Sequence, residues 1–201
     1  MTTGTIYQIR PLDPSERIAA FSVADARSRW LDRRCLPRNT RAIRDAVRQD
    51  ADVVAFFEDD DLVGLLQLHR TPALEHWSAE QRAEATLLVS AACVIPGRTD
   101  YPGRLMTLWA RDFAARLGRQ WVRAEVPSPP GGETARLLTY LREACGWQRV
   151  NVHTTVTHLT ATSPTSSVVL MQCPAEEIPN LSALISSTVS LAEQTVTPAA
   201  P

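Results

Sequence analysis

The spacing of hydrophobic and polar residues predicts the secondary structure of most of the chain. Residues 5–10 alternate with the period of a strand, and residues 85–95 form an almost continuous apolar run that is typical of a central strand covered on both faces. After Pro102, apolar residues recur at helical spacing until Gly118, a common helix stop. Strand and helix periods therefore alternate along one chain.

The same reasoning gives the element order β-α-α-β-β-β-α-β-α-β-β. Asp13, Pro14 and Glu16 have the spacing of a capping box that opens the first helix. Strands are predicted at residues 5–10, 52–57, 62–69, 85–95, 120–126, 147–157 and 168–172, and helices at residues 14–33, after Asn39, and at 102–117 and 133–145. A hairpin meander that enters a β-α-β unit implies an α/β fold (α+β mixed sheet) with helices on its faces.

The length of 201 residues suits one domain, which we place at residues 1–174. Residues 175–201 contain no aromatic side chain and end in Pro-Ala-Ala-Pro. We expect them to form a flexible tail that is dispensable for stability, with a weak helix around residues 181–189 as the alternative.

Composition and charge narrow the function. The formal net charge is −1, which argues against a general binder of nucleic acids, although all 21 basic residues are Arg. The four Cys have no CxxC spacing. His153 and His158 are five residues apart, which places them on opposite faces of a strand and argues against a metal site. The chain lacks a signal-peptide pattern and an apolar run long enough to cross a bilayer. We therefore expect a cytoplasmic protein with reduced thiols, no metal and no membrane contact.

Three sequence features occur together between residues 91 and 147. The strand ends in Val94-Ile95-Pro96, and a loop containing Gly97 leads into the helix at Pro102-Gly103. A helix-Gly-strand step follows at Gly118, and a later helix ends in Cys145-Gly146-Trp147 before a closing strand at residues 168–172. Over residues 5–173 this pattern resembles the GCN5-related N-acetyltransferase (GNAT) family, and the helix-Gly-strand step is common in its actinobacterial members.

The resemblance implies that acetyl-CoA is the co-substrate. The amides at the start of the helix after Pro102 would hold its pyrophosphate, because a helix N-terminus offers unpaired N–H groups and a positive dipole end. The family's loop is divergent here, since Asp100 stands where the family has Arg or Gln and Leu105 replaces a small residue. The expected cofactor-binding residues are Cys93 and Val94, which would pair with the pantetheine arm, and Arg98, Thr99, Asp100, Tyr101, Gly103, Arg104 and Leu105 around the pyrophosphate. The strand ending at Val94 should then separate from the strand at residues 121–126.

The resemblance also implies transfer of an acetyl group to a primary amine of a small molecule or a protein. Tyr140 and Arg142 are the candidates for assisting the leaving thiolate, and Glu84 is the candidate base, with Glu75, His76 and His69 as alternatives. Trp30 and Trp77 could line an acceptor pocket. The alternative function is that of a catalytically weak GNAT-fold protein that acts as a ligand-binding or interaction module. A homodimer stays open.

Overall fold

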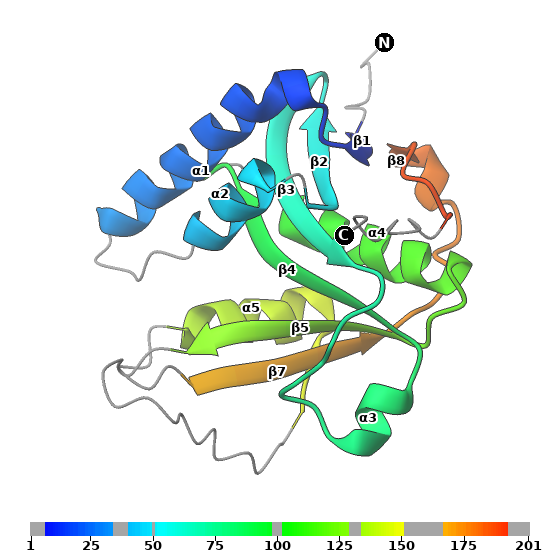
Figure 1. The fold of residues 1–201 in the computed structure, drawn as a ribbon. Helices are drawn as coiled ribbons and strands as arrows, with labels where there is room; N and C mark the ends of the chain where they lie inside the picture. Colours follow the sequence, from blue (N-terminus) through cyan, green and yellow to red (C-terminus); the bar gives the residue numbers. More distant parts are fainter. Residues whose placement is uncertain are drawn as a thin grey trace, which may run out of the picture.

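An eight-stranded mixed sheet forms the centre of the described part of the protein (Figure 1). The computed structural model describes residues 7–33, 40–49, 51–97, 102–128, 134–150 and 167–192. The strand order is β6-β7-β5-β4-β3-β2-β1-β8, and neighbours are antiparallel except for the parallel pairs β4–β5 and β1–β8. The strands are β1 (Tyr7–Pro11), β2 (Val53–Glu58), β3 (Asp61–His69), β4 (Thr86–Val94), β5 (Trp121–Ser128), β6 (Gln148–Arg149), β7 (Ser167–Pro174) and β8 (Ile185–Ser187).

Helices cover both faces of this sheet. The helices are α1 (Arg17–Asp32), α2 (Thr40–Arg48), α3 (Ala79–Ala83), α4 (Pro102–Arg116) and α5 (Ala135–Cys145), with short 3-10 turns η1 (Pro14–Glu16) and η2 (Leu181–Ala183). Helices α1 and α2 lie on one face, and α4 and α5 lie on the other (Figure 1). The helices therefore cover two cores: a large one under α4 and α5, and a smaller one under α1 and α2. A third, small cluster is formed by Leu74, Trp77 and Leu170.

The predicted mixed sheet is confirmed, and so are several local signals. The Asp13 carboxylate accepts from the backbone N–H of Ser15, and the Glu16 side chain completes the capping box. Gly146 closes α5 in the left-handed region at φ 75°, a conformation that glycine adopts without a steric cost. The helix predicted after Asn39 is α2, and its buried side chains include Ile43, Ala46 and Val47.

Two segments differ from the prediction. The sequence predicts a loop at residues 71–82, which have no clear hydrophobic period, yet α3 begins within this segment, after Ser78, with a second capping box closed by Gln81. Five residues are too few for a helical period to be visible. Of the strand predicted at residues 147–157, only Gln148 and Arg149 form β6, and the part from residue 151 onward lies outside the described residues.

The expectation of a flexible tail or weak helix is wrong for residues 175–192. After β7 the chain crosses α4, turns through η2 and adds β8 in parallel to β1. Its apolar side chains Leu181, Ile185 and Val189 are buried in the large core. Hydrogen bonds hold the crossing in place: Asp112 accepts from the backbone N–H of Ile178, and Trp109 Nε1 donates to Ser187. A few well-spaced aliphatic residues suffice to pack this segment on the protein, because the outer surface of α4 supplies the rest of the contact.

No helix among the described residues is both long and apolar enough to cross a membrane.

Candidate functional site

Strands β4 and β5 separate halfway along their length. They pair in parallel from Thr86–Trp121 to Val89–Ala124, and the register then stops although β4 continues to Val94 and β5 to Ser128. The two ribbons diverge toward their carboxyl ends in Figure 1. The separation predicted for the strand ending at Val94 is therefore confirmed. Among the described residues, it leaves the facing edges of β4 beyond Val89 and of β5 beyond Ala124 without a strand partner.

A bulge in β4 accompanies this separation. Leu65 of β3 pairs with Cys93 and Gln67 pairs with Ser90, so that one residue of β3 faces both Ala91 and Ala92 of β4. Ala91 has a φ of 51°, in the left-handed region that a side chain makes unfavourable. Bulges bend and twist a strand. The bulge thus turns β4 away from β5 immediately after the last pair.

Polar side chains gather where the strands separate. On β3 and β4 the residues Leu66, Leu68 and Val89 point into the core under α4, so their neighbours point to the opposite face, which carries α1 and α2. The same alternation places Glu125 of β5 on that face, because Val122 and Val126 belong to the α4 core. We call this set of residues the splay cluster: Gln67, His69, His76, Ser90 and Glu125.

Hydrogen bonds connect the splay cluster in two groups. His69 Nε2 lies 2.8 Å from Ser90 Oγ, and Ser90 Oγ donates to Gln67 Oε1 at 3.1 Å. His76 Nδ1 lies 2.9 Å from Glu125 Oε2. Burial holds the pKa of His69 below its ordinary value, and the negative charges of Asp52 and Glu125 oppose this shift only in part. His69 is therefore neutral at pH 7 and able to accept a proton.

Trp77 fixes the Glu125 carboxylate from the opposite side. Its indole Nε1 donates to Glu125 Oε1 at 3.0 Å, and its ring lies 4.5 Å below the guanidinium of Arg123. Arg123 is fully buried and donates to the backbone carbonyl of Gln81 and to the carboxylate of Glu84. The connection between β3 and β4 is thus clamped onto β5, and Trp77 is a buried positioning residue rather than a wall of an open pocket.

This clamp corrects the expectation for Glu84. Glu84 precedes β4, at the end where β4 and β5 are still paired, and its carboxylate binds Arg123. It lies five residues before Val89, about 17 Å along an extended strand. The carboxylate beside the separation is that of Glu125.

The Tyr140 side chain packs against the first turn of α4, at the place where the sequence predicts that the pyrophosphate binds. A Cβ at Gly103 would lie 3.0 Å from Tyr140 Oη. Burial and a hydrogen bond with the Cys145 thiol raise the pKa of the Tyr140 phenol, while a hydrogen bond from the backbone of Arg104 acts in the opposite direction. The phenol therefore keeps its proton at neutral pH and already uses one of the amides at this helix N-terminus.

Val94 and Cys93 differ in what they offer to a ligand. The backbone N–H of Ile95 donates to Val63 of β3 at 2.9 Å, and hydrogen-bonding direction alternates along an antiparallel ladder. The backbone groups of Val94 consequently face the opened side of β4, and those of Cys93 face β3. The Cys93 side chain is buried under α1 and α2, where burial raises the pKa of its thiol to about 11. Only Val94 fits the role expected of the pair.

The remaining predicted residues are placed as follows. Arg142 is an exposed residue on the outer side of α5 and pairs with Glu143 Oε1 at 3.0 Å, because the inward positions of this helix are Leu138, Leu141 and Cys145. It does not join Tyr140 at the core. Arg104 is exposed and Leu105 packs against the large core in the first turn of α4. Arg98, Thr99, Asp100 and Tyr101 lie outside the described residues.

Comparison with solved structures identifies the architecture. The sequence matches no protein-family model and no curated protein. An acetyltransferase of the GNAT family from Listeria monocytogenes superposes with a TM-score of 0.58 at 14% identity, over 84% of this chain and 94% of that one. A GNAT-family protein from Desulfovibrio desulfuricans gives 0.60 at 16% identity, over 86% and 100%. The ribosomal-protein alanine N-acetyltransferase from Escherichia coli gives 0.52 at 13% identity, over 85% and 94%.

The chain has the GNAT fold. At these identities the likeness concerns the fold alone, so the residues of this GNAT-fold protein have to be judged by their own geometry. Among the described residues, no group of three or more His, Cys, Asp or Glu side chains could hold a metal ion.

Glu125 and Ser90 were missed as site residues although the sequence contained a signal for both. Val122, Ala124 and Val126 give β5 an apolar face, and a charged residue between them on a central strand is unusual. Ser90 interrupts the apolar run of β4 in the same way. Neither signal says that the two residues lie on neighbouring strands, which depends on the parallel pairing of β4 with β5.

Proposed function

We propose that this protein is an N-acetyltransferase that uses acetyl-CoA to acylate a primary amine. The observation that carries the proposal is the position of the splay cluster at the point where β4 and β5 separate. The separation leaves an edge for an extended acyl carrier, and the cluster supplies proton acceptors beside it. The GNAT fold supports the proposal as an analogy of architecture.

The reaction has three requirements. The amine loses a proton, its nitrogen attacks the thioester carbonyl carbon, and the carbon–sulfur bond breaks so that the CoA thiolate leaves and takes up a proton. The products are an amide and free CoA, and no oxidant or metal is needed for the balance. This chain must therefore provide a proton acceptor on one side of the thioester and a hydrogen-bond donor on the other.

Glu125 and His76 form the proton acceptor in this proposal. The Glu125 carboxylate accepts from the Trp77 indole, which leaves its other oxygen to the imidazole of His76. A carboxylate on Nδ1 fixes the tautomer of a histidine and leaves the lone pair of Nε2 available to accept a proton. The neutral His69, hydrogen-bonded to Ser90, provides a second acceptor within the same cluster.

Tyr140 is the donor for the leaving sulfur. Its phenol stays protonated at neutral pH, and the backbone of Arg104 polarises it. A phenol whose pKa is raised transfers its proton poorly, so Tyr140 acts by donating a hydrogen bond to the developing thiolate rather than by full transfer. The acyl carrier itself would pair with the free edge of Val94.

The test combines binding and turnover with acetyl-CoA as the probe. Calorimetry should show acetyl-CoA binding, and release of free CoA thiol in the presence of a panel of primary amines should identify acceptors. Glu125→Gln should bind acetyl-CoA like the wild type and lose roughly a hundredfold in turnover, the usual size of a general-base contribution. Binding without turnover for any amine would favour the non-catalytic module, and absence of binding would refute both the cofactor and the activity.

A further inference from the structure

The charge of the chain is distributed unevenly. Residues 27–48 contain eight Arg and only two Asp, whereas the rest of the sequence contains thirteen Arg and twenty acidic residues. A chain that is nearly neutral as a whole therefore has one strongly basic segment and an acidic remainder. Such an asymmetry indicates a surface that attracts an anionic partner while the rest of the molecule repels a large polyanion.

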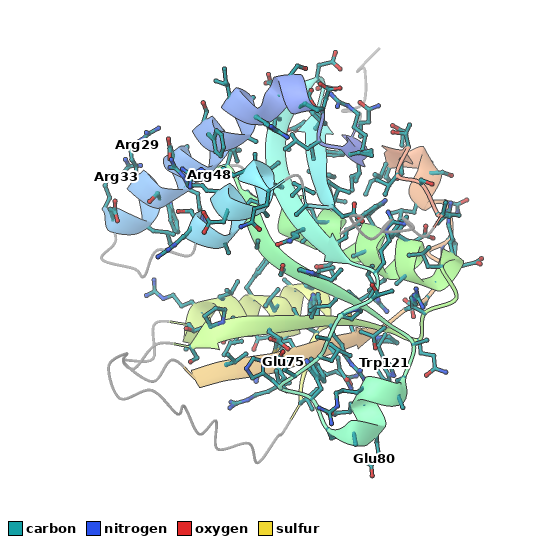
Figure 2. All side chains as sticks on the ribbon, viewed as in Figure 1. Arg29, Arg33, Arg48, Glu75, Glu80 and Trp121 are labelled. Atoms are coloured by element: carbon teal, nitrogen blue, oxygen red, sulfur yellow. The ribbon has the colours of Figure 1, made fainter. Side chains whose placement is uncertain are left out.

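The described part of this segment forms the outer surface of α1 and α2. Figure 2 shows Arg29 and Arg33 at the free end of α1, where they lie one turn apart, and Arg48 on α2. Arg41 belongs to the first turn of α2. All four are exposed, and the Arg41 side chain has 93% of its surface accessible. We call Arg29, Arg33, Arg41 and Arg48 the arginine surface.

Neutralisation of this surface is incomplete. Asp45 is shared between Arg41, at 3.5 Å, and Arg48, at 3.2 Å, while Asp25 pairs with Arg44. Within the described ranges, no carboxylate forms an ion pair with Arg29 or Arg33. Exposed arginines that stay extended without carboxylate partners keep their full attraction for an anion.

The arginine surface adjoins the opened end of the sheet. Helices α1 and α2 pack on the same face as the splay cluster, over Leu65 of β3 and over Ala91 and Cys93 of β4. The charge of Arg27 acts on the Cys93 thiol, and Arg33 lies six residues farther along α1, about 9 Å at the rise of a helix. The surface thus begins roughly 10–20 Å from the reacting position, a distance that an extended chain covers in about three to six residues.

We propose that the arginine surface docks an acidic segment of a protein acceptor whose reacting amine enters at the splay cluster. This inference rests on the proposed function for the role of the amine. A small amine cannot bridge the two places, whereas a peptide with acidic residues about four positions from its amine can. A nucleic acid fits less well, because the remaining surface is acidic and the nearby aromatic rings of Phe21 and Trp30 are covered by arginine guanidinium groups.

Binding can be tested without any assumption about catalysis. The probes are two fluorescent peptides with the same free amino terminus, one with an acidic run and one with a basic run about four residues away, and a single-stranded RNA of similar length. The wild type should bind the acidic peptide at low salt and lose affinity as salt rises. Arg29→Gln/Arg33→Gln should weaken this binding about tenfold, while the exposed control Arg82→Gln/Arg149→Gln, which removes the same charge elsewhere, should not.

Several results would overturn the proposal. Equal affinity for the acidic and basic peptides, or equal losses in the two double variants, would remove the specific role of the surface. Tighter binding of the RNA would make it a nucleic-acid surface, and loss of acetyl-CoA affinity in Arg29→Gln/Arg33→Gln would assign it to the cofactor. If the acidic peptide binds as expected but mass spectrometry finds no acetylated product, the docking surface stands and the proposed activity fails.

Discussion

The Tyr140 hydroxyl lies against the backbone of Gly103, where a Cβ would be only 3.0 Å from the phenol oxygen. The glycine that opens α4 thus accommodates a side chain of α5 as well as any ligand. Without the hydroxyl, the nearest ring carbons would be 3.5 and 3.7 Å from the added Cβ, which is ordinary van der Waals contact. The oxygen atom alone makes the position tight.

A double-mutant cycle follows from this contact. Gly103→Ala should lower the free energy of unfolding by about 1–2 kcal/mol more in the wild type than in Tyr140→Phe, because the clash disappears with the hydroxyl. Urea unfolding of the four proteins measures the difference. Additive effects would mean that Tyr140 does not pack on Gly103, and the cofactor experiments should then be interpreted without it.

Truncation after Pro174 should destabilise the protein strongly. It removes β8 from the edge of β1 and exposes the sites of Leu181, Ile185 and Val189. Burial of three aliphatic side chains contributes about 4–7 kcal/mol, an upper estimate, so Tm should fall by roughly 10 °C or more. Truncation after Ala192 keeps every contact described here and serves as the control. Equal melting of both truncated forms and the full chain would contradict the packing of this segment.

Substitution of Glu84 should affect mainly the stability of the protein, and substitution of Glu125 should affect mainly its activity. Glu84→Gln weakens the ion pair of the fully buried Arg123 and should lower the free energy of unfolding by about 1–3 kcal/mol, a value reduced because the carboxylate itself is partly exposed. It should leave the Michaelis constant for acetyl-CoA unchanged. Glu125→Gln should have the opposite pattern, with near-normal unfolding and a large loss of turnover. A base at Glu84 would reverse the two results.

His69 should make stability fall on acidification. Because burial lowers its pKa in the folded state, the unfolded chain binds a proton first as pH drops through about 6.5, and the folded state loses stability until pH reaches the folded pKa. Above pH 7 the contribution is complete. His69→Gln should therefore reduce the loss of stability between about pH 7.5 and 5.5, measured by urea midpoints. An NMR titration of His69 with a midpoint at or above the ordinary value would contradict the prediction.

The sequence predicts elements well where the pattern is long and local. The periods of α4 and β4, the capping box at Asp13 and the stop at Gly146 each depend on a few neighbouring residues. Short elements escape this reasoning: β8 has three residues, and its place beside β1 depends on a core to which distant segments contribute. The expectation of a flexible tail fails at residues 175–192 for that reason.

The residues of the candidate site also divide into those indicated by a local sequence pattern and those that depend on distant segments. For Val94 and Gly103 the local strand-loop-helix pattern predicts a contact with the cofactor, and this contact stays a prediction. Within the splay cluster, the sequence makes His69 and His76 candidates. It does not indicate Glu125, because Glu125 and its partner Trp77 are 48 residues apart and meet only after β4 is inserted beside β5. Arg142 is the opposite case: the sequence makes it a candidate beside Tyr140, but it lies on the exposed side of α5 and pairs with Glu143.

The free edge of β4 gives a specific test of the acyl carrier's position. Proline lacks the backbone N–H and is tolerated in a strand only where that N–H has no ladder partner. Val94 directs its N–H toward the opened side of β4, whereas Ile95 donates to Val63. Val94→Pro should therefore fold with nearly normal stability, and Ile95→Pro should be destabilised by the loss of a ladder hydrogen bond.

Acetyl-CoA affinity should distinguish the role of Val94 from a general effect of proline. If the pantetheine arm accepts or donates at this edge, Val94→Pro should bind acetyl-CoA about five- to tenfold more weakly, the value of roughly one hydrogen bond. Calorimetry on Val94→Pro and on the matched Val94→Ala, which keeps the N–H, measures the difference directly. Equal affinity of Val94→Pro and Val94→Ala for acetyl-CoA would place the carrier away from this edge of β4, because the comparison tests the backbone N–H that proline lacks.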